Sequence, residues 1–150
     1  MADLSSSLKL WLEYDLNSNK KVLSVIENNL GHIPDDVLKL FSHIIAAHHI
    51  WNIRITGEER MYGVWERIPV SDMEKVIKNN FDTSIHILEN MDLFKEISYV
   101  NTIGDAYINT AEDIFFHVLT HNHYHRGQIA RILRENQIDP PDTNYIVFRR

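Results

Sequence analysis

The sequence predicts an all-α protein, an antiparallel four-helix bundle with a small hairpin or loop before its last helix. Four segments repeat apolar residues every three to four positions, the spacing of a helix that buries one face. Short connections join these segments, which places successive helices antiparallel. The 150 residues, 44% of them hydrophobic, can bury one sizeable core. We therefore expect a single domain over residues 1–150.

Composition excludes several classes of protein and of site. The chain has no cysteine, so any metal site must use histidine or carboxylate ligands. A net charge of −6 argues against a nucleic-acid partner. No apolar run approaches the ~20 residues that span a bilayer. The N-terminal stretch is too acidic and too interrupted for a signal peptide. These features predict a cytoplasmic protein without a membrane partner.

The first two predicted helices follow directly on each other. The first covers residues 4–30, with Gly31 as its C-terminal cap. The second covers residues 34–57, with Pro34 in its first turn and Gly57 at its end. Its apolar stripe consists of Val37, Leu40, Ile44, Trp51 and Ile55.

The third predicted helix covers residues 71–91, after a loop rich in aromatic residues. Ser71 and Glu74 have the spacing of a capping box, in which each side chain binds the backbone N–H of the other residue. His86 falls opposite the apolar stripe of this helix, so we expect it to face solvent.

Residues 97–110 form two short alternating runs about Gly104, which predicts a small hairpin. Thr110 and Asp113 then predict the start of a fourth helix over residues 110–136. Pro140 and Pro141 prevent the fourth helix from continuing into the C-terminal tail. The apolar residues 145–148 are expected to pack back onto the bundle.

The fourth helix carries a cluster of histidines in the stretch "HVLTHNHYHRGQI", residues 117–129. Positions four apart lie about 40° from each other around a helix, so His117, His121 and His125 share one side and His123 points away. Burying several imidazoles costs free energy unless their nitrogens are satisfied. A divalent ion would satisfy them, and two histidines four apart can bind one ion. The alternative is one hydrogen-bonded core histidine with two others near the surface.

A third ligand is expected from the second helix, which offers His43, His48 and His49. Periodicity favours His48, because it lies in the middle of the apolar stripe. His43 lies at the edge of the stripe and His49 on its far side. Spacing alone leaves the choice open.

Three stretches, "SHIIAAHHIWNIRITGE", "SYVNTIGDAYINTAEDIFFHVLTHNHYHRGQI" and "PPDTNYIVF", resemble the DinB-like (DNA-damage-inducible, YfiT-type) metalloprotein family. The resemblance implies a four-helix bundle with a divalent metal held by one histidine of helix 2 and two of helix 4. Carried over residue by residue, the ligands are His43, eight residues before Trp51, and the pair His121 and His125 ending in "HRGQ". This assignment replaces His48, since a site between helices needs ligands that flank the core.

Several further residues are candidates for the surroundings of the site. His48 stands where many relatives have an acidic residue, and its role is open between support of the metal ligands, substrate contact and packing. His117 is expected to be a hydrogen-bonded neighbour of the ligands, and Gln128 to orient a ligand or a bound water. Gly127 is expected to allow close helix approach. Trp51, with Tyr62 and Trp65, either walls an apolar pocket or belongs to the core.

Three neutral histidines leave an open position on the ion, as in catalytic rather than structural zinc sites. We expect zinc or nickel as the cofactor. The resemblance implies a metal-dependent transferase that joins a low-molecular-weight thiol to a small electrophile, with a small-molecule substrate, and it also suggests a homodimer. One alternative is a hydrolase that uses a metal-bound water, with His48 as acid or base. The other is a stress-response module without turnover, in which the metal only links two helices.

Overall fold

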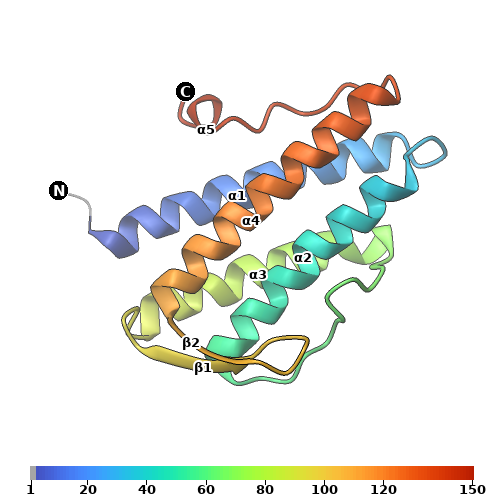
Figure 1. The fold of residues 1–150 in the computed structure, drawn as a ribbon. Helices are drawn as coiled ribbons and strands as arrows, with labels where there is room; N and C mark the ends of the chain where they lie inside the picture. Colours follow the sequence, from blue (N-terminus) through green and yellow to red (C-terminus); the bar gives the residue numbers. More distant parts are fainter. Residues whose placement is uncertain (1–2) are drawn as a thin grey trace.

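The computed structural model describes residues 3–150 and is mostly helical (Figure 1). Within these residues there are four long helices, a loop over residues 57–69 joins the second to the third, and a two-stranded antiparallel sheet precedes the last. The helices and strands are α1 (Leu4–Asn28), α2 (Asp35–Thr56), α3 (Val70–Asn90), β1 (Glu96–Val100), β2 (Ala106–Thr110), α4 (Ala111–Glu135) and the single-turn α5 (Tyr145–Phe148). The predicted helical class and the predicted hairpin are both confirmed.

Each long helix contacts two of the others. Helices α1 and α2 both pack against α3 and against α4, so α2 and α4 are direct neighbours (Figure 1). The hairpin lies at the end of the molecule where α2 ends and α4 begins. The adjacent faces of α2 and α4 are therefore held in place by α1 and α3 behind them.

Two clusters of buried apolar side chains fill the space between the helices. One gathers about Phe41 of α2 and the other about Phe115 of α4, and both rings are at most 1% exposed. Burying one such side chain stabilises a fold by about 1.5–3 kcal/mol. Because α2 and α4 each carry an anchor of this kind, their backbones form a rigid support for side chains between them.

The ends of the helices test the predicted caps. Thr110 and Asp113 form the predicted capping box at the start of α4. Gly57 ends α2 in the left-handed conformation (φ 79°), which glycine adopts without steric cost. The predicted box of Ser71 and Glu74 is wrong: α3 begins at Val70, with Pro69 as its cap and no side-chain cap bond. Proline's fixed φ suits a helix start, so Ser71 already lies inside the first turn.

Two other boundaries concern the ends of the chain. Helix α1 ends at Asn28, two residues before the predicted boundary and ahead of Gly31. The C-terminal residues pack back on α1 as predicted, because the Tyr145 ring meets those of Trp11 and Tyr14 at centroid distances of 6.4 and 5.3 Å.

In the described part of the chain, no helix has the length and apolar character needed to cross a membrane.

Candidate metal centre

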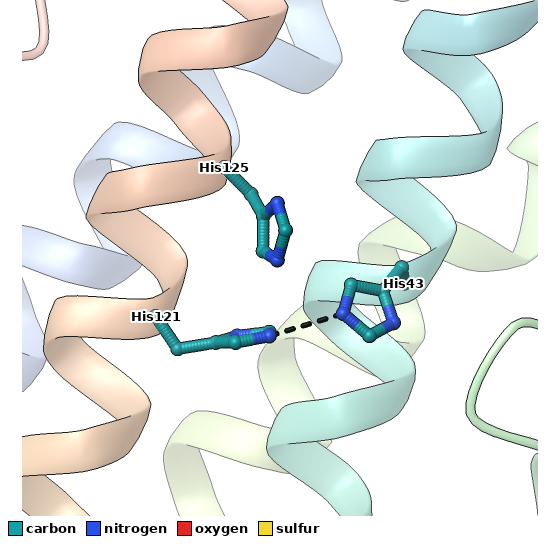
Figure 2. Close-up of side chains that lie close together, drawn as sticks. All are labelled: His43, His121 and His125. Atoms are coloured by element: carbon teal, nitrogen blue, oxygen red, sulfur yellow. Dashed lines mark hydrogen bonds between the residues drawn. The ribbon is translucent and has the colours of Figure 1, made fainter.

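Three histidines from two neighbouring helices converge between α2 and α4. His43 projects from α2 and meets His121 and His125, which project from successive turns of α4 (Figure 2). One ring nitrogen of each lies within 4.8 Å of those of the other two. Nitrogens bound to one zinc ion at about 2.0–2.1 Å are roughly 3–4 Å apart, so a small movement would close this group on an ion.

The outward nitrogen of each of the three imidazoles faces an oxygen. Nδ1 of His43 lies 2.8 Å from the backbone oxygen of Val64. Nδ1 of His125 lies 2.6 Å from Oε1 of Gln128, and Nδ1 of His121 lies 3.4 Å from Oδ1 of Asn122. Oxygen acceptors favour the tautomer with the proton on Nδ1. That tautomer leaves the lone pair of each Nε2 free to face the centre of the cluster.

The inward nitrogens are compatible with a bound cation. Nε2 of His43 and Nε2 of His121 are only 3.0 Å apart, the contact dashed in Figure 2. If both rings carry their proton on Nδ1, two lone pairs oppose each other across this gap. If one Nε2 carries the proton instead, its Nδ1 lone pair opposes an oxygen. A cation between the rings removes the conflict, because neutral imidazole nitrogens are ordinary ligands of divalent metals.

Burial favours the neutral form of His43 and His121. Burial, together with the like charges that His125 and His43 would carry, lowers the pKa of His121 to about 4. Burial also lowers the pKa of His43, against the opposing effect of its hydrogen bond to Val64. Since only the neutral form binds a metal, the lone pairs are available at pH 7.

Comparison with known proteins shows the family of this chain. The family model described as the DinB family matches residues 9–150. The chain belongs to the DinB family. Among curated proteins, the uncharacterized protein YizA of Bacillus subtilis (strain 168) is 27% identical over 126 residues, which cover 81% of this chain and 77% of YizA. The resemblance on which His43, His121 and His125 were chosen is therefore confirmed at the level of the family.

The DinB-family chain places His48 apart from the three histidines. His48 is 5% exposed and lies between α2 and α3, where its Nε2 is 2.9 Å from Oγ of Ser84. Ser84 in turn donates to Oδ1 of Asn52. Burial lowers the pKa of His48 to about 4. Periodicity thus located a buried position correctly, but the structure does not bring it to the cluster.

The remaining candidates divide between the cluster and its surroundings. Gln128 touches the cluster through His125, as expected of a residue that orients a ligand. His117 is exposed and lies beside His121, with 5.5 Å between ring centroids, but within residues 3–150 its ring makes no hydrogen bond to a ligand, so that part of the prediction is wrong. Trp51 packs against His117 and Tyr99, at centroid distances of 4.9 and 5.2 Å, and does not reach the three histidines.

Four further predicted residues lie outside the histidine cluster. His86 and His123 are exposed, as predicted. The expected role of Gly127 in close helix approach is wrong, because a Cβ added there would meet nothing within 4 Å. Tyr62 packs on the ring of His49, away from the cluster.

Sequence reasoning missed two parts of the site. Trp65, predicted to wall a pocket or to belong to the core, also stacks on His43 with 3.7 Å between ring centroids and 8° between planes. Asp15 of α1 and Arg126 of α4 form a buried ion pair, which no sequence motif indicated. Asp15 and Asn19, four apart among the apolar residues of the first helix, were the available signal for the second.

A cavity of about 440 Å³ opens beside the cluster, between α2 and α4. Its walls include Trp65, which stacks on His43, and Gln128, which binds His125. Lys39 and Leu40 of α2 also line it. This volume lies within the range of small-molecule sites.

Proposed function

We propose that this DinB-family protein is a four-helix bundle that binds one divalent metal ion through His43, His121 and His125. The observation that carries the proposal is the 3.0 Å contact between Nε2 atoms of two rings whose Nδ1 atoms already face oxygens. Imidazole ligands suit zinc and nickel, and such a site follows the general affinity order of the metals rather than selecting one.

We further propose that the bound ion serves a transferase that joins a low-molecular-weight thiol to a small electrophile. A divalent ion with three protein ligands keeps an open position, where it lowers the pKa of a thiol or of water. The cavity supports this proposal, since it offers space for a small molecule against Trp65, which stacks on His43, and Gln128, which binds His125. A hydrolase has less support, because His48, its expected acid or base, lies between α2 and α3.

The proposed transfer is a substitution at carbon. The thiolate sulfur forms a carbon–sulfur bond, the leaving group departs with the bonding electron pair, and the thiol proton passes to solvent. In this scheme the chain's own groups bind and orient. Gln128 holds the ring of His125 through Nδ1, Val64 holds that of His43, and Trp65 covers the open face of the His43 ring.

Elemental analysis of protein purified without a histidine tag tests the metal site. We expect near-stoichiometric zinc or nickel in the wild type and its loss in His43→Ala. Absence of metal from the wild type, even after reconstitution with both ions, would refute the proposal.

Transfer is tested with the reconstituted protein, free L-cysteine and an aryl halide, following the thioether and the released halide. We expect product formation above that of His43→Ala treated in the same way. Equal rates for the two proteins, despite bound metal in the wild type, would refute transfer from this thiol while leaving metal binding intact. Homodimer formation stays a prediction, which light scattering would test.

A further inference from the structure

A buried carboxylate of α1 contacts α4 at two consecutive turns. Oδ2 of Asp15 accepts a hydrogen bond of 2.9 Å from Nδ2 of Asn122. Oδ1 of Asp15 accepts one of 2.6 Å from NH1 of Arg126. The Asp15 and Arg126 side chains are 2% and 1% exposed, and Asn122 is fully buried. One carboxylate therefore uses each of its oxygens to hold a different turn of the same helix.

Both partners of Asp15 directly follow a proposed metal ligand. Asn122 comes after His121 and Arg126 comes after His125. Successive residues of a helix point about 100° apart, so one pair can face α1 while the other faces α2. Because Asp15 binds two turns of α4, it fixes the rotation of this helix about its own axis. That rotation decides whether His121 and His125 face His43.

Asn122 also connects this carboxylate to one ligand directly. The amide nitrogen of Asn122 donates to Asp15. This hydrogen bond orients the amide so that Oδ1 of Asn122 lies 3.4 Å from Nδ1 of His121. An oxygen in this place favours the tautomer that leaves Nε2 free for a metal. The chain of contacts from Asp15 through Asn122 thus ends at a donor atom of the site.

The ion pair is poorly arranged as a source of stability alone. Among residues 3–150, Nε and NH2 of Arg126 have no hydrogen-bond partner and are buried, although NH1 also reaches Oδ1 of Asn19 at 2.9 Å. Removing two charges from water is costly, and apolar side chains of similar volume often replace such pairs without loss of stability. Orientation of α4 therefore explains this ion pair better than a contribution to the stability of the fold does.

We propose that Asp15 is a positioning residue of the metal site, which holds α4 in the rotation that directs His121 and His125 at His43. This inference rests on the proposed metal-binding function. It predicts that metal affinity and coordination geometry depend on Asp15 even when the stability of the protein does not.

Four variants separate positioning from stability. In Asp15→Asn, one oxygen becomes a donor that cannot accept from Asn122 or from Arg126. In Asn122→Ala, the ion pair stays and only the connection to His121 is lost. The double variant Asp15→Leu with Arg126→Met replaces the ion pair with apolar side chains. Ser84→Ala is the matched control, since it breaks buried hydrogen bonds between α2 and α3 and removes no partner of Asp15, Asn122 or Arg126.

Each protein is measured for zinc affinity by competition with a chromophoric chelator, for its Co²⁺ absorption spectrum, and for its unfolding temperature without metal. We expect roughly 10- to 100-fold weaker zinc binding and an altered Co²⁺ spectrum in Asp15→Asn and Asn122→Ala. The double variant should unfold at or above the wild-type temperature and still bind zinc at least about tenfold more weakly. Ser84→Ala should unfold at a lower temperature with unchanged zinc affinity and spectrum.

Zinc affinity within about twofold of the wild type in Asp15→Asn and Asn122→Ala would overturn the inference and leave the metal site intact. Recovery of wild-type affinity in the stable double variant would also overturn it, because affinity would then follow stability. Failure of the wild type to bind zinc or Co²⁺ would instead refute the proposed function on which the inference rests.

Discussion

The Nε2 atoms of His43 and His121 face each other at 3.0 Å, while Nδ1 of each ring faces an oxygen. Two neutral rings in this arrangement cannot satisfy all four nitrogens with hydrogen bonds, because each ring has only one N–H. A cation between the rings would let both keep their proton on Nδ1, so the three histidines are expected to act as a unit.

Removal of any one ligand should release the metal. We predict severe loss of metal occupancy in His43→Ala, His121→Ala and His125→Ala, since two imidazoles bind an ion much more weakly than three. Elemental analysis of each purified variant measures this loss.

The exposed histidines give the matched controls for these variants. His86→Ala and His123→Ala should keep wild-type occupancy, because neither side chain reaches the cluster. Loss of metal in His48→Ala together with full occupancy in His43→Ala would show that the ligand assignment is wrong.

Gln128 should act on the metal through His125 rather than by touching it. Gln128→Ala removes the oxygen 2.6 Å from Nδ1 of His125, and we expect roughly tenfold weaker zinc binding. Gln128→Glu keeps an acceptor at this place and should retain most of the affinity. Competition titrations of both variants measure the difference, and equal affinity in Gln128→Ala and the wild type would exclude this role.

The metal-free protein should lose stability in acid through His48. Its pKa is about 4 in the folded chain and 6.5 in the unfolded one, so the unfolded state binds more protons between these values. The free energy of unfolding therefore falls as the pH drops from 6.5 toward 4, by about 2–3 kcal/mol for this one buried group. Urea unfolding of metal-free protein at pH 7 and pH 4.5 measures the change.

His48→Gln isolates this effect, because glutamine can keep a hydrogen bond to Ser84 but does not titrate. The variant should show a smaller fall in stability between the two pH values than the wild type. An identical fall in both proteins would mean that other groups account for the acid sensitivity.

Chelation should leave the metal-free chain folded. The two apolar clusters about Phe41 and Phe115 do not depend on the three histidines, so the far-UV circular dichroism should stay helical after treatment with EDTA. The unfolding temperature should fall, since a ligand at 100 times its Kd stabilises a protein by about 2.7 kcal/mol. Loss of the helical signal on chelation would instead favour a module in which the metal mainly links α2 to α4.

Local patterns predicted the helices well but could not place every boundary. Thr110 and Asp113 form their capping box because nothing before Thr110 competes to start the helix. At α3 the same pattern failed, because Pro69 starts the helix ahead of Ser71. Capping patterns in a sequence thus identify candidate starts, and the preceding residue decides between them.

Helical periodicity recognised a shared side for His121 and His125, because their spacing is a property of one helix. It could not choose His43 over His48, since both are buried and the choice depends on which neighbouring helix each one faces. The family resemblance supplied this information. Asp15 escaped notice for the same reason, because its partners lie on α4, more than 100 residues further along the chain.

The stacking of Trp65 on His43 gives the protein its own optical reporter. The indole lies parallel to a proposed ligand, 3.7 Å away between centroids, whereas Trp11 and Trp51 pack against other rings. A cation bound by His43 would perturb the excited state of the Trp65 indole. Tryptophan emission should therefore follow metal binding in the wild type and become insensitive to it in Trp65→Phe, so that occupancy can be read without a label.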